Sequence, residues 1–257
     1  MTQLAPNIEL LFTEAGELPD RVRAAAAAGF DAVEIWSILG PDLPSLKAVL
    51  AETGVTLTAA LAEYPPATSF TWPDSDPSGY LERVERAVEA AVTVGCPRIV
   101  VAGGVGFPGR SRAANLDLLA EVFTQAVARV AGSGVTLVVE PVNTRVNHPG
   151  ALLDRTADAV QVARAVDDDS FGVLYDLYHS VTEGEDPAAV LADAGALVKY
   201  VQIADVPGRG EPGTGAIDWA SSFATLRAAG YDGPIGLEYY PTVGSAESVK
   251  PVVALAS

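Results

Sequence analysis

The sequence is poor in several features that mark particular classes of protein. It contains a single cysteine, Cys96, so no disulfide can form within the chain, and we expect a reduced, cytoplasmic setting. No apolar run reaches the roughly 18 residues that a membrane-spanning helix needs. The N-terminus also lacks the basic start and apolar core of a signal peptide. A membrane is therefore not expected as a partner.

Positive charge and histidine are also scarce. The chain has 16 Lys and Arg against 33 Asp and Glu, a formal net charge of −17, and only 2 histidines. Nucleic acid is not expected as a partner, because binding to phosphates needs clustered basic side chains. A small-molecule substrate is compatible with this charge, because a binding site can differ from the average surface.

Apolar, strand-like runs alternate with helical patterns along the 257 residues. The expected strands cover residues 7–12, 31–36, 55–61, 98–102, 135–140, 171–176, 198–203 and 234–239. The expected helices cover residues 17–28, 42–52, 79–94, 112–132, 154–166, 186–195, 217–229 and 244–255. This α/β alternation over a chain of this length predicts a single (β/α)₈ TIM-barrel domain spanning residues 1–257. A doubly wound open sheet would more often carry a glycine-rich phosphate turn after its first strand, and residues 12–16 do not form one.

Four of the expected strands carry a polar side chain at or beside the carboxyl end. These side chains, each after a short apolar run, are Glu140, Asp176, Gln202 and Glu238. If the strands form one barrel, the four side chains converge at its C-terminal mouth, where such folds keep their chemistry. Three carboxylates and one amide oxygen suit a hard divalent cation, and they would accept Mg²⁺, Mn²⁺ or Co²⁺. We therefore expect all four residues to be metal ligands.

Each of these residues also has a structural interpretation when it is taken alone. Glu140 could form an ion pair with Arg145. Asp176 could cap the turn that follows it, and Gln202 could bond to the backbone. The position that all four share, at successive strand ends, favours a common metal site.

Two further residues are candidates for contact with a substrate. His179 follows a strand end and, as a neutral imidazole, could hydrogen-bond a hydroxyl or carbonyl group. Arg209 follows Gln202 by seven residues and could grip a carboxylate or polarise a carbonyl. The structural alternatives are a loop histidine satisfied by the protein, and a surface ion pair between Arg209 and Asp205 or Glu211.

Other polar residues are less informative. Glu34 ends the second expected strand, and a role in the site and a structural role fit that position equally well. His148 has no strand context and is expected at the surface. Cys96 lies at the start of a strand, away from the mouth, so we do not expect a nucleophile there.

Two long loops, residues 62–78 and 103–111, should lie on the same face as the four polar residues. The first contains several prolines together with Phe70 and Trp72. Because loops carry both function and variation, it is a candidate substrate lid as well as an ordinary connection.

The ligand set favours proton transfer next to a carbonyl group. The metal would bind the carbonyl and hydroxyl oxygens and stabilise an enediolate as a Lewis acid. Glu140 and Glu238 would act as the catalytic pair, one removing the α-proton and the other returning a proton. Return to the neighbouring carbon gives an aldose–ketose isomerase, and return to the opposite face gives a ketose epimerase. This chemistry needs no redox cofactor.

Six segments between residues 140 and 241 form a specific set. They are Glu-Pro-Val-Asn-Thr-Arg (140–145), Asp-Leu-Tyr-His (176–179), Glu-Gly-Glu-Asp (183–186), Gln-Ile-Ala-Asp-Val-Pro-Gly-Arg (202–209), Glu-Pro-Gly-Thr-Gly (211–215) and Gly-Leu-Glu-Tyr-Tyr-Pro (236–241). In this region, about 40% of the chain, the sequence resembles the hydroxypyruvate isomerase family of the xylose-isomerase-like barrel superfamily.

The resemblance implies an enzyme that interconverts hydroxypyruvate and tartronate semialdehyde, with a divalent metal at the four strand-end residues. It implies that Glu140 and Glu238 are the acid/base pair. Similarity to the related ketose 3-epimerases implies that His179 and Arg209 contact the substrate. Two departures concern substrate choice. The Gly-Glu-Arg-Gly segment that such isomerases tend to carry after the third strand is absent, and Ala216 stands where a glutamate is usual.

Other functions on the same barrel stay open. The alternatives are a ketose 3-epimerase or a sugar or oxo-tetronate isomerase, a non-catalytic sugar-binding barrel, and a three-zinc endonuclease. The intact ligand set disfavours the non-catalytic barrel, and the scarcity of histidine and basic residues disfavours the endonuclease. A homodimer or homotetramer is compatible with the sequence.

Overall fold

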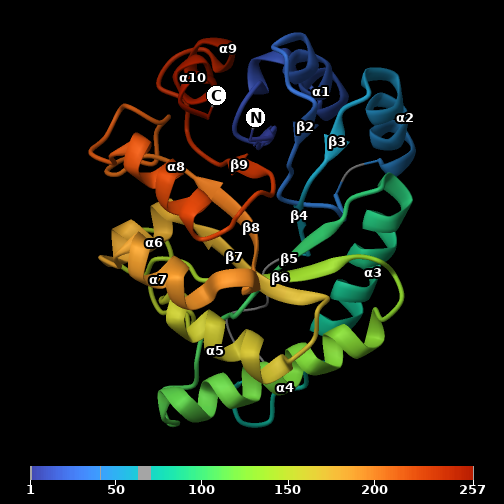
Figure 1. Ribbon diagram of the computed structural model, residues 1–257. Helices are drawn as coiled ribbons and strands as arrows, with labels where there is room; N and C mark the ends of the chain where they lie inside the picture. The colour runs from blue at the N-terminus through green and yellow to red at the C-terminus, as the bar shows by residue number, and fades with distance from the viewer. Residues whose placement is uncertain (1, 41, 63–70, 257) are drawn as a thin grey trace.

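Parallel strands form a ring at the centre of the computed structural model, which describes residues 2–40, 42–62 and 71–256 (Figure 1). The strands are β1 (Leu4–Pro6), β2 (Ala32–Val33), β3 (Thr56–Leu57), β4 (Ala60–Leu61), β5 (Arg98–Ala102), β6 (Thr136–Glu140), β7 (Phe171–Asp176), β8 (Val198–Ile203) and β9 (Ile235–Leu237). One sheet has the order β1-β9-β8-β7-β6-β5-β4, and β2 pairs with β3.

Backbone hydrogen bonds around β2 join the two ends of this sheet. The Glu34 N–H donates to the Pro6 carbonyl at 3.0 Å, and the Leu61 N–H donates to the Trp36 carbonyl at 2.7 Å. The strands therefore enclose an interior, and the prediction of an α/β TIM barrel is confirmed. That residues 1–257 form a single domain stays a prediction.

Helices surround the ring (Figure 1). They are α1 (Leu18–Ala27), α2 (Leu43–Thr53), α3 (Ser78–Val94), α4 (Arg112–Arg129), α5 (Thr156–Val166), α6 (Leu177–Glu183), α7 (Pro187–Ala194), α8 (Trp219–Ala228), α9 (Ser245–Ser248) and α10 (Lys250–Ala256), with 3₁₀ turns η1 (Thr13–Ala15) and η2 (Gly195–Leu197). The long helices bury one stripe, as α3 does with Val84, Ala87, Val88 and Ala91. Within the described ranges, none of these helices has the length and apolarity to cross a bilayer.

Three predicted elements differ from the structure. The first strand is Leu4–Pro6 rather than 7–12, because the Asn7 carbonyl accepts from the N–H groups of Leu10 and Leu11 at 3.1 and 2.8 Å and turns the chain. The strand expected at 55–61 is divided into β3 and β4. The helix expected at 244–255 is divided into α9 and α10, and Pro251, which has no N–H to donate, suits the first turn of the second piece.

Side chains alternate between the two faces of each strand, and this alternation brings the polar residues at the strand ends together. The interior of the ring holds an apolar layer made by Ala59, Val100, Val138, Leu174 and Tyr200. Because side chains alternate between the two faces of a strand, residues two positions further along point into the same interior. Glu140, Asp176 and Gln202 each follow a residue of this layer by two positions, and Asp176 pairs with Gln202 across β7 and β8. The polar layer therefore lies at the C-terminal mouth of the barrel.

Candidate active site

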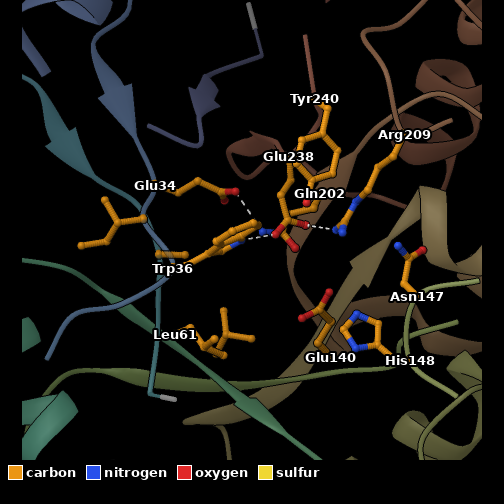
Figure 2. A pocket seen from close by; sticks show the side chains of 13 residues that line it. Glu34, Trp36, Leu61, Glu140, Asn147, His148, Gln202, Arg209, Glu238 and Tyr240 are labelled. Atoms are coloured by element: carbon orange, nitrogen blue, oxygen red, sulfur yellow. Dashed lines mark hydrogen bonds and ion pairs between the residues drawn. The ribbon is translucent and has the colours of Figure 1, made fainter. Parts of the chain in front are cut away.

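A cavity of about 420 Å³ opens at the carboxyl ends of the strands (Figure 2). It is lined by Glu34, Ile35, Trp36, Ala59, Leu61, Val100, Glu140, Asn147, His148, Gln202, Arg209, Glu238 and Tyr240. Three of the four predicted metal ligands are in this lining. The fourth, Asp176, is buried beside them, with its Oδ2 3.5 Å from Arg209 Nη2. The structure thus brings the four predicted ligands together, and their roles stay predictions.

Glu140 and Asp176 are the last residues of β6 and β7, and both are buried. Burial, followed by repulsion from Glu238 and from Asp176, raises the pKa of Glu140 well above its ordinary value. Burial also raises the pKa of Asp176 to about 7, against the opposing effect of Arg209. Carboxyl groups gathered in so small a buried volume repel one another, and a cation among them would stabilise their charged forms.

The structure shows one of the two structural alternatives, the cap by Asp176, and not the other, an ion pair between Glu140 and Arg145. Asp176 does cap α6, because its Oδ1 accepts from the Tyr178 N–H at 2.7 Å and from the His179 N–H at 3.4 Å. Its second oxygen still faces the site. Glu140 does not pair with Arg145, whose Nε lies 3.1 Å from Glu183 Oε2 instead.

Gln202 carries the clearest sign of a missing partner. Its Nε2 donates to Glu34 Oε1 at 2.9 Å, whereas its buried Oε1 has no hydrogen-bond partner among the described residues. An unpaired buried acceptor is costly, and a cation would satisfy it. Glu34 is thereby part of the site, a position that the sequence left open. Burial, followed by the charge of Glu238, raises the pKa of Glu34 to about 8.

Glu238 directly follows β9 and is held by two donors (Figure 2). Arg209 Nη2 donates to its Oε2 at 2.6 Å, and Trp36 Nε1 donates to its Oε1. The Arg209 guanidinium also lies over the Tyr178 ring, 5.1 Å from the ring centroid. Arg209 is therefore inside the site, and its contact with a substrate stays a prediction.

The alternative ion pairs of Arg209 are absent from the described part of the chain. Asp205 instead accepts from Trp219 Nε1 at 3.0 Å and from backbone N–H groups of its own loop. Glu211 accepts from the Thr242 hydroxyl at 2.6 Å. Both carboxylates stabilise loops beside the mouth of the barrel.

His179, in α6, has a defined tautomer. Its Nδ1 accepts from the Asn143 backbone N–H at 2.9 Å and from Asn143 Nδ2 at 2.6 Å. The Asn143 amide is oriented independently, because its Oδ1 accepts from the N–H groups of Val146 and Asn147, both at 3.0 Å. Burial, followed by the charges of Arg209 and His148, lowers the pKa of His179 well below its ordinary value. The ring is therefore neutral, with its proton on Nε2.

This tautomer distinguishes two possible roles for His179. One potential ligand atom from each of Glu140, Asp176 and His179 lies within 4.8 Å of the others, so a metal group including the imidazole is geometrically conceivable. A protonated Nε2 is a donor and not a metal ligand, however. The roles of the carboxylate and amide oxygens as metal ligands, and of the Nε2–H as a donor to the substrate, stay predictions.

The prediction that His148 lies at the surface is wrong. Its side chain is half-buried and lines the cavity, with its ring centroid 5.5 Å from that of His179. The chain after β6 folds back over the mouth, because the Asn143 carbonyl accepts from the His148 N–H at 2.9 Å. An adjoining cavity of about 310 Å³ shares Glu140, Asn147 and His148 and extends towards Gly104.

The two long loops meet each other near this second cavity. Residues 63–70 of the first loop, including Phe70, lie outside the described residues. Trp72 Nε1 donates to the Val105 carbonyl at 3.3 Å, and the Trp72 and Phe107 rings lie 5.2 Å apart. The role of a substrate lid stays a prediction.

Away from the mouth, burial raises the pKa of the Cys96 thiol to about 12, which disfavours a nucleophilic thiolate.

Trp36 and Asn143 were not predicted from the sequence. Trp36 follows Glu34 by two residues, so strand alternation points it into the same interior. Asn143 stands in the Glu-Pro-Val-Asn segment and acts on His179 through a contact that spans 36 residues. The alternation of side chains along the strand could have indicated Trp36, whereas no local pattern in the sequence indicates Asn143.

Comparison with known proteins identifies the family of the chain. The family model described as "Xylose isomerase-like TIM barrel" matches residues 22–252. A putative hydroxypyruvate isomerase from Streptomyces coelicolor is 34% identical over 256 residues, covering 91% of this chain and 89% of the relative. A 2-oxo-tetronate isomerase from Cupriavidus necator is 33% identical over 259 residues, covering 95% of each.

Among solved structures, the crystal structure of an AP endonuclease, family 2, from Brucella melitensis superposes with a TM-score of 0.88 at 26% identity, covering 99% of each chain. The resemblance to hydroxypyruvate isomerases that the sequence motifs predicted is confirmed by the relatives. The chain belongs to the xylose isomerase-like TIM barrel family.

Proposed function

We propose that the protein is a divalent-metal-dependent isomerase of small hydroxy-keto acids, of the kind that interconverts hydroxypyruvate and tartronate semialdehyde. The observation that carries the proposal is the convergence of three buried carboxylates and one unpaired amide oxygen around a single cavity. The names of the two isomerases that this chain resembles over more than nine-tenths of its length support it.

The residues at the mouth fit a divalent cation. Glu140, Asp176 and Glu238 would supply carboxylate oxygens, and Gln202 would supply the amide oxygen that lacks a partner. Such an all-oxygen set suits Mg²⁺ or Mn²⁺, and it also accepts Co²⁺. When bound, the cation would supply Lewis-acid polarisation of the carbonyl and hydroxyl groups of the substrate.

Glu140 and Glu238 reach the cavity from β6 and from the end of β9, as an acid and a base on separate strands would (Figure 2). Glu238 accepts hydrogen bonds from Arg209 and Trp36, which hold its carboxyl group at the cavity, and it would take the α-proton at a carboxylate oxygen. Glu140 would return a proton to the neighbouring carbon from its carboxyl group.

His179 and Arg209 would bind and orient the substrate. The Nε2–H of His179 would donate to a hydroxyl or carbonyl oxygen, and Asn143 keeps the ring in the tautomer that this contact needs. Arg209 would contact the carboxylate of the keto acid through its guanidinium. The apolar wall formed by Ile35, Leu61 and Val100 would exclude water from the reacting carbons.

A longer substrate is the second candidate. The adjoining cavity of about 310 Å³ begins at Glu140 and would accept the tail of a four-carbon oxo-tetronate or of a larger ketose. A ketose 3-epimerase would use the same acid/base pair. Nuclease action is disfavoured by the net charge of −17 and by the presence of only 2 histidines in the chain.

Proton NMR in D₂O tests the proposal and ranks the substrates. The protein with saturating Mg²⁺ would be incubated with hydroxypyruvate, with 2-oxo-tetronates and with four- to six-carbon ketoses. We expect exchange of the α-proton and formation of the isomer for the keto acids. The absence of both exchange and product with every compound would refute isomerase activity. Epimerisation of a ketose alone would replace the proposal with the epimerase.

A further inference from the structure

Glu34 contacts a proposed metal ligand without being one of the four itself. Its Oε1 accepts from Gln202 Nε2 at 2.9 Å and from Asn7 Nδ2 at 3.2 Å, and its Oε2 accepts from the Tyr200 hydroxyl at 2.6 Å. The three donors come from the end of β1 and from β8, and the Glu34 side chain is 1% exposed. Its carboxylate therefore has a fixed place beside the amide of Gln202 (Figure 2).

This contact determines which end of the Gln202 amide faces the cavity. A side-chain amide has a donor end and an acceptor end, and in its ionised form, in which both oxygens accept, Glu34 has no proton to donate. The nitrogen of Gln202 must therefore face Glu34, and the oxygen must face the other way. A flipped amide would place two acceptor oxygens at hydrogen-bond distance from each other. Because the nitrogen of Gln202 faces Glu34, its Oε1 points away from Glu34 and has no partner among the described residues.

The backbone of β9 lies close against this pair. Gly236 lies opposite Gln202 in the register of β8 and β9. A Cβ atom at Gly236 would lie 2.3 Å from Glu34 Oε2 and 2.9 Å from Gln202 Cγ. The Tyr200 hydroxyl supports Glu34 from the other side and also contacts Thr58 Oγ1 at 2.9 Å. The pair is therefore held on several sides by strands of the barrel.

We propose that Glu34 is a positioning residue, which fixes the Gln202 amide so that its oxygen, and not its NH₂ group, is presented to a divalent cation among the strand-end carboxylates. The inference rests on the proposed function, because the cation is part of that proposal. Without Glu34 the amide could turn its NH₂ group towards the cation, which would weaken binding.

The test is the dissociation constant of Mn²⁺, measured by isothermal titration calorimetry on folded, metal-stripped protein. We expect Glu34→Leu to weaken binding about 10- to 100-fold, which is the usual effect of removing a residue that orients a metal ligand. Glu34→Gln keeps an acceptor for Gln202, because its NH₂ group can face the Tyr200 hydroxyl, which then donates to Thr58. This variant should therefore stay within roughly threefold of the unaltered protein.

A second background shows whether Glu34 acts through Gln202. In Gln202→Leu, the further change Glu34→Leu should leave the affinity for Mn²⁺ unchanged. Tyr200→Phe is the matched control, because it removes a donor to Glu34 but leaves the contact between Glu34 and Gln202; it should lower the melting temperature without changing the affinity. Gly236→Ala, which pushes the pair apart while keeping all charges, carries the test if Glu34→Leu does not fold.

The outcomes separate the inference from the proposed function. Unaltered affinity in Glu34→Leu, or the same loss of affinity in the Gln202→Leu background, would overturn the positioning role alone. If Glu34→Leu does not fold, unaltered affinity in Gly236→Ala would overturn it. Failure of the unaltered protein to bind Mn²⁺ would overturn both the positioning role and the proposed metal site.

Discussion

Replacement of Glu238 by glutamine separates the chemistry of this carboxylate from its place in the structure. Glutamine keeps the volume of the side chain but can accept at only one of its two terminal atoms. In the folded protein both oxygens of Glu238 face donors, Arg209 Nη2 at 2.6 Å and Trp36 Nε1. In the variant one of these donors would face an NH₂ group.

The expected magnitudes follow from these contacts. Loss of a hydrogen bond to a charged group costs about 1.5–3 kcal/mol of folding free energy. This corresponds to a fall in melting temperature of about 3–12 °C for a chain of this size. Loss of a general base lowers the rate by about 10²- to 10⁴-fold, which is roughly 3–5 kcal/mol on the barrier. The variant should therefore stay folded and lose its turnover.

The assay is α-proton exchange with D₂O at saturating Mg²⁺, followed by NMR, with the melting temperature measured on the same sample. Glu185→Gln is the matched control. Glu185 also accepts from three donors, the Thr156 N–H at 2.8 Å, the Thr156 hydroxyl at 2.6 Å and the Ser180 hydroxyl at 2.8 Å, but it does not line the cavity. The control should lose stability and keep its exchange rate. A folded Glu238→Gln protein with a near-native exchange rate would remove Glu238 from the acid/base pair.

Three other predictions concern pH, the support of the site and substrate binding. The folded-state pKa values of Asp176 and Glu34, about 7 and about 8, exceed the ordinary values of 3.8 and 4.5, so between about pH 4.5 and pH 7 the metal-free folded protein holds protons that the unfolded chain has lost. Its free energy of unfolding should fall as the pH rises from about 4.5 to 8, by up to about 1.4 kcal/mol per pH unit for each such proton, and thermal unfolding in EDTA that shows no fall would contradict the shifts. Tyr200→Phe leaves the Glu34 carboxylate without its donor at 2.6 Å and should cost about 1–3 kcal/mol; an unchanged midpoint of urea unfolding would refute this. His148→Ala should raise KM more than it lowers kcat, whereas a hundredfold loss of kcat at constant KM would give His148 a part in the chemistry.

The part of the site that depends on strand periodicity could be predicted from the sequence. Glu140, Asp176 and Gln202 each follow an apolar run at the carboxyl end of a strand, and parallel strands bring such ends to one mouth. The first strand was misplaced, because Ile8, Leu10, Leu11 and Phe12 are apolar and buried but follow a turn that begins at Asn7. Burial of an apolar run does not by itself distinguish a strand from a packed turn.

Contacts between distant segments could not be predicted in the same way. The bond from Gln202 to Glu34 spans 168 residues, and the bond from Trp36 to Glu238 spans 202 residues. His148 was misassigned because its position depends on how the chain folds back after β6, through a hydrogen bond to Asn143. Such pairs depend on the closure of the barrel, which periodicity predicts only as a class of fold.

The most direct test of a metal-dependent isomerase is metal removal and replacement with one substrate. Metal-stripped protein would be incubated with hydroxypyruvate in D₂O, and Mg²⁺ or Mn²⁺ would then be added in steps while NMR follows exchange and product. We expect no turnover before addition, and activity that saturates at one cation per chain, since the four proposed ligands surround a single site. Full activity of the stripped protein in excess EDTA would contradict the metal site at Glu140, Asp176, Gln202 and Glu238.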